Sequence, residues 1–140
     1  MSFVVKAFCL FRTDDKVLLY QRKNEHNGIE FLRPLGGKVE FGERSSDTVK
    51  REILEETGEQ VMELRLLGVI ENIYQNGHTL KHEIDFVYDG KFKNRALYRQ
   101  SEVFVKEGNA RYTARWVEIE KARSGSPPVL PPELVGLFGA

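Results

Sequence analysis

With 140 residues, 41% of them hydrophobic, the chain is long enough to bury the core of one ordinary domain, which we expect to span residues 1–140. Its 21 basic residues balance its 21 acidic ones, which argues against broad attraction to nucleic acid or to a membrane surface. No apolar run approaches the ~20 residues of a membrane span, and the N-terminus lacks the apolar region of a signal peptide. The one cysteine, Cys9, lies in an apolar run, so we expect a buried strand residue and a reducing, cytoplasmic location.

The first elements are strands. Runs rich in β-forming residues predict strands over 3–11 and 17–21, joined at a Thr-Asp-Asp turn. The polar segment 23–30 indicates a loop, in which we expect His26 to be exposed. Gly36 and Gly37 predict a tight turn that lies close to a ligand. The alternation of Val39 and Phe41 with polar residues predicts a short strand that runs into Gly42.

A helix follows this glycine turn. Ser45 and Ser46 are residue types that cap helix N-termini, and Asp47 suits the positive end of the helix dipole. Apolar residues then recur at helical spacing, and Gly58 stands where a left-handed C-terminal residue is wanted.

The second half of the chain contains more strands. An Asn-Gly turn at 76–77 predicts a hairpin between a strand over 66–74 and a strand over 79–88. Leu80, His82, Ile84 and Phe86 share one face of the latter strand, so we expect His82 on its apolar, buried side. Further elements are expected in this order: an irregular segment over 91–110, a strand over 111–117, a short helix over 118–122, a rigid loop over 124–132 and a helical turn over 133–138.

Three glutamates of the helix point to chemistry. Glu52, Glu55 and Glu56 stand at i, i+3 and i+4, so they occupy neighbouring positions of one face. Such charges repel one another unless they are offset, by Arg51 four residues before Glu55 or by a divalent cation such as Mg²⁺ or Mn²⁺. A solvated acidic face is the alternative interpretation.

The spacing of residues over the whole segment around the helix favours a bound cation over a solvated acidic face. The sequence matches G-x5-E-x7-R-E-U-x-E-E-x-G-U, where U is aliphatic, at the following residues: Gly37, Glu43, Arg51, Glu52, Ile53, Glu55, Glu56 and Gly58. This pattern resembles the Nudix box, and the protein is similar to Nudix hydrolases. One position departs from the pattern, because Glu59 stands at the last aliphatic site. Val61 is expected to supply the apolar contact that this exchange removes.

The resemblance implies an α/β fold, the Nudix-type α/β/α sandwich with a mixed sheet between helices. It implies a metal-dependent hydrolase that cleaves the diphosphate of a nucleoside diphosphate linked to another group, X. By the same resemblance, the catalytic residues are Glu52, Glu55, Glu56 and Arg51. The metal, Mg²⁺ or Mn²⁺, is expected on Glu52, Glu55, Glu56 and the carbonyl of Gly37. Glu43 either supports the loop, belongs to an outer shell of the metal site, or is purely structural.

Several roles stay open at this stage. The general base is a glutamate of the box or an acidic residue of a later loop, where Glu102 and Glu107 are candidates. Arg33 either reaches a phosphate or lies on the surface. Four aromatic residues either stack on a base or pack in the core: Tyr74, Phe86, Tyr98 and Trp116. Of these candidates, Arg33 and Tyr74 are the predicted substrate-binding residues.

Three functions compete. The first is the hydrolase, with a small nucleotide as substrate, no membrane partner, and a monomer or homodimer as the assembly. The second is a Nudix-like nucleotide-binding or regulatory module without turnover, for which the exchange at Glu59 is a faint motive. The third is a hydrolase of RNA ends, which the neutral charge balance disfavours, so nucleic acid is not the expected partner. The sequence leaves the identity of X and of the base open.

Overall fold

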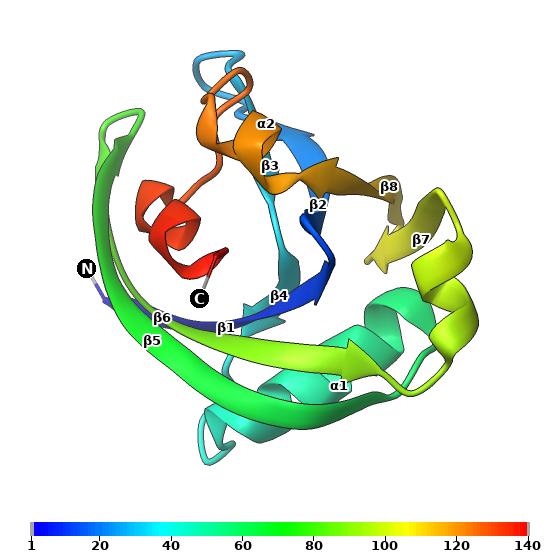
Figure 1. The fold of residues 1–140 in the computed structure, drawn as a ribbon. Coiled ribbons are helices and arrows are strands. Elements are labelled where there is room, and N and C mark those ends of the chain that lie inside the picture. Colours follow the sequence, from blue (N-terminus) through cyan, green and yellow to red (C-terminus); the bar gives the residue numbers. More distant parts are fainter. Residues whose placement is uncertain (1, 140) are drawn as a thin grey trace.

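A mixed sheet between helices forms the framework, so the predicted α/β sandwich is confirmed (Figure 1). The structure, a computed structural model, describes residues 2–139. Its elements in chain order are β1 Phe3–Thr13, β2 Lys16–Lys23, β3 Glu30–Arg33, β4 Leu35–Lys38, α1 Ser45–Thr57, β5 Val61–Asn76, β6 Thr79–Phe92, η1 Arg95–Arg99, β7 Glu102–Glu107, β8 Ala110–Glu118, α2 Ile119–Arg123 and η2 Pro132–Leu137. No helix among residues 2–139 is long and apolar enough to cross a membrane.

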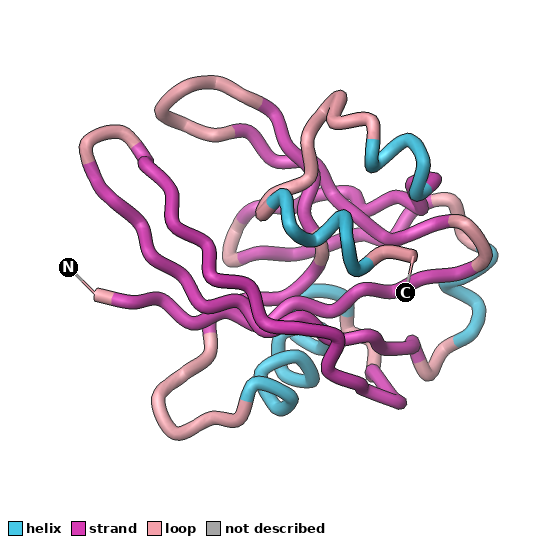
Figure 2. Tube along the Cα trace, turned by 60° about the vertical axis from the view of Figure 1, so that its left-hand side comes forward, coloured by secondary structure: helices cyan, strands magenta, loops and turns pink. Residues whose placement is uncertain are grey.

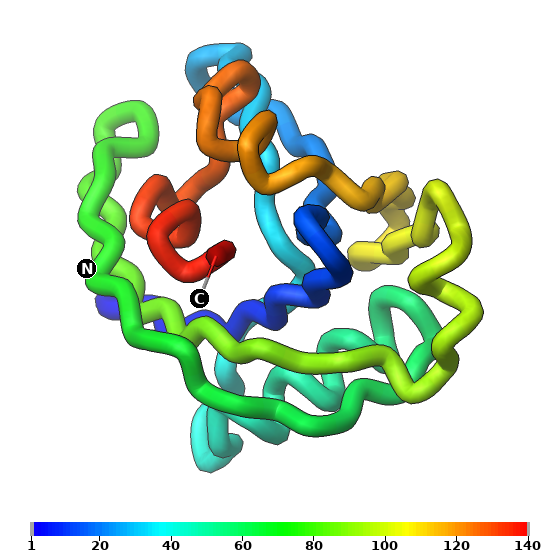
Figure 3. The backbone as a smooth tube through the Cα atoms, viewed as in Figure 1, coloured from blue at the N-terminus to red at the C-terminus, as the bar shows by residue number. Residues whose placement is uncertain are grey.

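The sheet buries apolar side chains on both of its faces because β1 and β2 alternate their residues between two cores. On one face Cys9, confirmed as fully buried, and Phe11 pack with Val49 and Ile53 of α1. On the other face Leu10 packs with residues of α2 and η2, among them Ala122 and Leu134. Helical segments therefore lie on both sides of the strands (Figure 2), and the C-terminal segment lies inside the curve of the β5–β6 hairpin (Figure 3).

The two central strands separate soon after their turn. β1 and β2 pair only at Arg12↔Val17 and Thr13↔Lys16. Beyond that point β1 pairs with β4 and β6, whereas β2 pairs with β3 and β8. The sheet is thus divided into two arms, β5-β6-β1-β4 and β3-β2-β8-β7, which diverge from the β1–β2 turn. A ligand can enter where the arms diverge without breaking a ladder of hydrogen bonds.

The short strand expected at 39–41 is wrong, because the strand that forms is β4, at Leu35–Lys38. It pairs with β1 through both glycines, with Phe8 opposite Gly36 and Ala7 opposite Gly37. A Cβ at Gly36, where φ is +151°, would collide with the backbone of Ala7. The glycines therefore permit close strand pairing, and Phe41 is left fully exposed in the loop that follows.

The expected irregular segment over 91–110 is also wrong in part. It contains the 3₁₀ turn η1 and the strand β7, whose Val103 and Val105 alternate into the core below α1. The predicted caps of the box helix differ as well. Arg44 is the N-cap residue and makes no side-chain cap, whereas Ser45 contacts the hydroxyl of Tyr88 at 2.6 Å. Gly58 ends the helix in the left-handed conformation, as expected.

The expectation that His82 lies on a buried side of β6 is confirmed only in part, because the residue is half-buried and its buried Nε2 has no hydrogen-bond partner among residues 2–139. The side chain of Leu80, on the same face, is 65% exposed, and His82 makes an edge contact with the ring of Phe3. The buried face is the opposite one, which carries Glu83 and Asp85. The hydrophobic alternation of β6 therefore does not mark its more buried side, although Phe86 on the apolar face packs against the core.

Candidate active site

Arg51 connects the loop before α1 to the helix itself. Its Nε donates to Glu43 Oε2 at 2.8 Å, and its other nitrogens donate to Lys38 O and Glu52 Oε1, each at 3.0 Å. These hydrogen bonds, with a further one from Thr48, hold the pKa of Glu43 down at about 2. The pKa of Arg51 is raised, chiefly by its hydrogen bonds with Glu43. The pair fixes the shape of the loop that carries the box residues, so Glu43 supports that loop.

Glu56 is the most buried acid of the helix. Its side chain is 4% exposed, and its Oε1 accepts a hydrogen bond from the backbone N–H of Gly36 at 3.2 Å. Its Oε2 is buried and has no hydrogen-bond partner among residues 2–139. Burial, followed by the nearby charge of Glu52, raises the pKa of Glu56 to about 8. A buried carboxylate oxygen without a donor is costly, and a cation would remove that cost.

Glu52 lies against the backbone of β4. A Cβ at Gly37 would overlap the carboxylate of Glu52, so only glycine permits this close approach. Burial raises the pKa of Glu52, while the hydrogen bond and charge of Arg51 act in the opposite direction. Two interacting carboxylates and a glycine backbone therefore meet between β4 and α1, and they offer the oxygen ligands that hard divalent cations prefer.

Glu55 differs from the other two acids. Its side chain is exposed and lies 3.4 Å from Arg51, from which it accepts hydrogen bonds. Within the described part of the chain, no three His, Cys, Asp or Glu side chains form a ready-made metal site. Mg²⁺ typically uses only one or two protein carboxylates and completes its shell with water and substrate phosphate. Glu52, Glu56 and the backbone at Gly37 match this mode of Mg²⁺ coordination.

Glu107, at the end of β7, faces the box from the other arm of the sheet. It accepts hydrogen bonds from Arg22 at 2.9 Å and from the hydroxyl of Tyr20 at 3.3 Å. Its charge adds to the effect of burial in raising the pKa of both Glu52 and Glu56. Glu102 lies at the opposite end of β7, where it pairs with Arg115 at 3.4 Å. Of the two acids considered for the general base, the fold brings Glu107 to the box glutamates.

Arg33 lies where the two arms diverge. Its guanidinium carbon lies 5.3 Å from the ring centre of Phe8 on β1 and 5.6 Å from that of Tyr20 on β2. Its Nε is buried and has no hydrogen-bond partner in the described chain. Burial raises the pKa of both Glu56 and Asp85, and the charge of Arg33 opposes each increase. Arg33 therefore stands between the box and the buried acids of β6.

A cavity of about 880 Å³ opens beside Arg33, on the side away from the box. It is bounded by β1, β5 and β6, by the loop after β2, and by the start of η2; residues from each of these are Phe8, Tyr74, Glu83, His26 and Pro132. Tyr74 donates its hydroxyl to Glu83 Oε2 at 2.9 Å. The other three aromatic candidates, Phe86, Tyr98 and Trp116, pack against the core, which confirms that interpretation for them.

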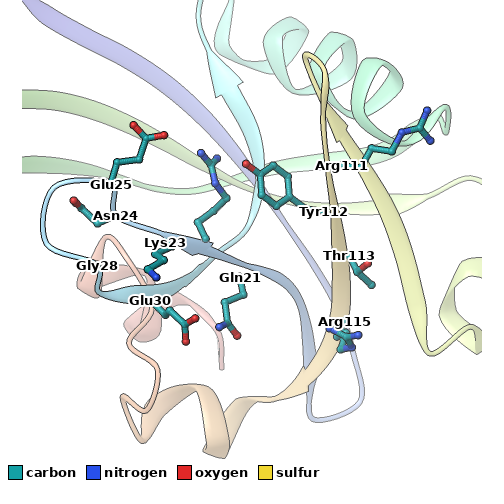
Figure 4. A pocket seen from close by; sticks show the side chains of 11 residues that line it. Gln21, Lys23, Asn24, Glu25, Gly28, Glu30, Arg111, Tyr112, Thr113 and Arg115 are labelled. Carbon is teal, nitrogen blue, oxygen red and sulfur yellow. The ribbon is translucent and has the colours of Figure 1, made fainter.

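A second, shallower cavity of about 750 Å³ lies on β2 and β8 and shares residues 22–25 with the first one. Figure 4 shows Tyr112 pointing across it toward β2 and Arg111 pointing away. The guanidinium carbon of Arg22 lies 4.7 Å from the ring centre of Tyr112. Arg22 thus contributes to this cavity and also holds Glu107.

Several site residues have no clear signal in the sequence. Arg22 and Tyr20 read only as strand residues, and Lys6 stands out only as a charge within an apolar strand. The departure from the pattern at the end of the box has little structural effect. Glu59 is half-buried and its carboxylate accepts a hydrogen bond from Asn94 at 3.5 Å, and Val61 packs against the core as expected.

Comparisons with known proteins agree with this geometry. The family model described as NUDIX domain matches residues 3–133. Among named relatives, a Bacillus subtilis protein called "Uncharacterized Nudix hydrolase YvcI" is 40% identical over 75 residues, which cover 54% of this chain and 45% of that protein. The "NAD-capped RNA hydrolase NudC" of Enterobacter sp. (strain 638) is 46% identical over 54 residues, which cover 39% of this chain and 20% of that protein. The matches thus span less than half of these relatives' lengths.

Solved structures extend the likeness to nearly the whole chain. A MutT NUDIX hydrolase from Burkholderia pseudomallei superimposes with a TM-score of 0.65 at 25% identity, and the alignment covers 86% of each chain. A NUDIX hydrolase from Nitrosomonas europaea has a TM-score of 0.69 at 23% identity over 98% of this chain and 86% of that one, and it supports the fold alone.

Proposed function

The chain belongs to the Nudix family, whose members hydrolyse acid anhydrides of nucleoside diphosphate derivatives with divalent cations. From that premise we propose that this protein cleaves the diphosphate of a nucleoside diphosphate linked to another group, with Mg²⁺ or Mn²⁺ at its box. The strongest support is the Oε2 atom of Glu56, which lies near Glu52 and is buried without a hydrogen-bond partner in the described part of the chain. That arrangement is unfavourable in an empty site and favourable around a cation.

The cation would be held by Glu52, Glu56 and the carbonyl of Gly37, with Glu55 as the remaining ligand on the exposed side. When bound, it neutralises charge on the diphosphate and lowers the pKa of a water molecule. Arg51 orients Glu52 and Glu55, because it donates to both carboxylates. Its hydrogen bonds with Glu43 keep the guanidinium in place while the substrate exchanges.

Glu107 is our candidate for the general base, in preference to Glu102. Arg22 and Tyr20 hold its carboxylate on the side that faces the box glutamates. A base in this position would accept a proton from the water as its oxygen bonds to phosphorus, while the bridging P–O bond breaks and the leaving phosphate keeps the electron pair.

Arg33 and Tyr74 bind the substrate in this proposal. The buried Nε of Arg33 has no hydrogen-bond acceptor among residues 2–139, which a phosphate oxygen would supply, and Arg33 stands between the box and the larger cavity. Tyr74 lines that cavity, which is large enough for a nucleoside or a sugar. The diphosphate would thus lie at the box, and one of the groups that it links would enter the cavity.

The test compares the wild type with Glu56→Gln on a panel of anhydrides, first with Mg²⁺ and then with Mn²⁺. The panel contains ADP-ribose, nucleotide sugars, oxidised nucleoside triphosphates, dinucleoside polyphosphates and CDP-linked alcohols. It also contains NAD and NAD-capped RNA, because the NudC relatives carry that description. Products are identified by chromatography.

We expect turnover of one substrate class, and a decrease of about a hundredfold or more for Glu56→Gln. Glu59→Gln is the matched control, since Glu59 lies at the end of the box, where its carboxylate contacts Asn94, and it should keep the wild-type rate. A folded wild type that binds these compounds but hydrolyses none of them would instead support the alternative, a nucleotide-binding or regulatory module without turnover.

A further inference from the structure

A buried polar cluster lies on β6 and on the strands beside it, away from the box. Glu83 and Asp85 stand two residues apart on the same face, with 5% and 0% of each residue exposed. Lys6, the neighbour of Asp85 on β1, places its Nζ 3.0 Å from Glu83 Oε2. The hydroxyl of Tyr74 donates to the same oxygen at 2.9 Å. The proposed hydrolysis uses neither acid and has no role for Lys6.

Asp85 is the most buried member of this cluster. Neither of its carboxylate oxygens receives a hydrogen bond from an N–H or O–H group of residues 2–139. Burial and then the charge of Glu83 raise the pKa of Asp85, whereas Lys6 and Tyr74 help to keep Glu83 ionised. Lys6 therefore pairs with the carboxylate of Glu83, and Asp85 lies buried beside this ion pair.

The cluster faces the larger cavity, which Lys6, Tyr74 and Glu83 help to line, while Asp85 lies behind them. Arg33 lines the same cavity, and its charge also acts on Glu56 of the box. Arg33 supplies a positive charge near the box, where a phosphate fits, whereas at the cluster the charges of Glu83 and Lys6 offset each other. An uncharged polar group therefore suits the cluster better than a second phosphate, which would meet the carboxylate of Glu83.

We propose that Glu83, held by Lys6 and Tyr74, is the specificity-determining residue that binds the uncharged polar part of the substrate. That part carries neighbouring hydrogen-bond donors, either the amino group of a base or the vicinal hydroxyls of a sugar. A fixed carboxylate accepts such donors, and it repels groups that present only carbonyl oxygens. This inference rests on the proposed function, because it assigns the group whose diphosphate lies at the box.

Binding rather than turnover tests the proposal, with probes that the enzyme does not cleave. The probes are AMP, UMP, 2′-deoxy-AMP, ribose 5-phosphate and methylene diphosphonate, each titrated calorimetrically with Mg²⁺ present. Glu83→Gln should weaken AMP about tenfold to a hundredfold and leave methylene diphosphonate, which needs only the box, unchanged. Glu120→Gln is the matched control, because Glu120 forms an exposed ion pair with Arg123, and it should change no affinity.

The two sources of donors give different patterns in the wild type. If a base amino group binds, UMP is weaker than AMP and 2′-deoxy-AMP equals AMP. If the sugar hydroxyls bind, 2′-deoxy-AMP is weaker and ribose 5-phosphate keeps most of the affinity. Each pattern supports the proposal. Equal losses for AMP and methylene diphosphonate in Glu83→Gln, or no loss for either, would overturn it.

Glu83→Gln removes the ion-pair partner of Lys6, and this variant could fail to fold for that reason. Two further variants test the proposal in that case. Tyr74→Phe removes one hydrogen bond to Glu83 and should weaken AMP severalfold without affecting methylene diphosphonate. Lys6→Gln with Glu83→Gln removes both charges together and should reproduce the selective loss of AMP. If the wild type and the variants bind the probes as described but the wild type hydrolyses no substrate, only the proposed function is rejected. Normal hydrolysis with unselective binding losses rejects only this inference.

Discussion

Single ionisable groups in this protein have opposite effects on its stability. Glu43 is held by donors and its pKa is low, whereas Asp85 is buried against another acid and its pKa is high. A carboxyl group whose pKa falls on folding stabilises the fold when it is ionised, and one whose pKa rises destabilises it. The two residues therefore predict opposite pH dependences, which can be measured separately.

For Glu43, stability is present above the ordinary pKa of 4.5 and is lost as the pH falls through about 2. We expect Glu43→Gln to lower the urea midpoint at pH 7, with the difference from wild type shrinking between pH 4.5 and pH 2. Glu40→Gln is the control, because Glu40 is exposed and lies 3.7 Å from Arg51, and it should change the midpoint little. A deficit of Glu43→Gln that is equally large at pH 2 and pH 7 would contradict this assignment.

For Asp85, the folded state binds its proton more tightly than the unfolded state does, so its contribution falls as the pH rises above the ordinary aspartate pKa of ~3.9. Lys6, Glu83, Arg33 and Tyr74 are the charged and titratable groups that act on it. Asn resembles the protonated acid and can donate to Glu83. We expect Asp85→Asn to gain stability relative to wild type between pH 5 and pH 8, by about 1–3 kcal/mol in urea unfolding. A difference that does not change with pH would contradict this.

Among the elements, β4 and α1 form the site because β4 contains two glycines. Gly36 allows β4 to pair closely with β1, and Gly37 lets the strand lie against Glu52. Gly37→Ala would place a methyl group on the carboxylate of Glu52, with the backbone conformation unchanged. We expect a loss of Mg²⁺ affinity of about tenfold to a hundredfold, measured by calorimetry.

Gly136→Ala is the control for this change, since a Cβ at Gly136 meets no neighbouring atom. It should bind Mg²⁺ as the wild type does. If Gly37→Ala keeps both its fold and the wild-type affinity for Mg²⁺, then the backbone of β4 does not belong to the metal site.

At the scale of the whole molecule, divergence of the two arms leaves buried acids at their junction. The box glutamates are destabilised in the absence of a cation, since Glu52 and Glu56 have raised pKa values that come first from burial. Binding of a cation therefore stabilises the entire fold through linkage. The fold without a cation is less stable because the carboxylates of the site are already buried together before the cation binds.

We accordingly expect Mg²⁺ at a hundred times its Kd to stabilise the wild type by about 2.7 kcal/mol, which corresponds to roughly 5–10 °C in Tm for a chain of this size. EDTA should reverse the shift. Glu56→Gln should be more stable than wild type without metal and should respond much less to Mg²⁺. An equal shift for both proteins in scanning calorimetry would place the cation elsewhere.

The sequence by itself determined the box, its helix and the two hairpins. These features depend on local spacing: glutamates at i, i+3 and i+4, glycine in a left-handed conformation at the end of α1, and an Asn-Gly turn. The family follows from the same residues, because the pattern that holds a metal on a helix is short and contiguous. Packing at the end of the box tolerates Glu59 at the normally aliphatic position, because Val61, nearby along the chain, packs against the core instead.

Only the tertiary structure decided which faces are buried and which distant residues meet. The strand β4 exists because β1 pairs with it, and β7 because β8 does. The acids of β6 are buried because the arms diverge beside them, although their alternation in the sequence suggests an exposed face. Arg33 of β3 lies between Glu83 of β6 and the box glutamates, which Glu107 of β7 faces. Pairing between distant strands leaves no local periodicity that would have predicted this arrangement.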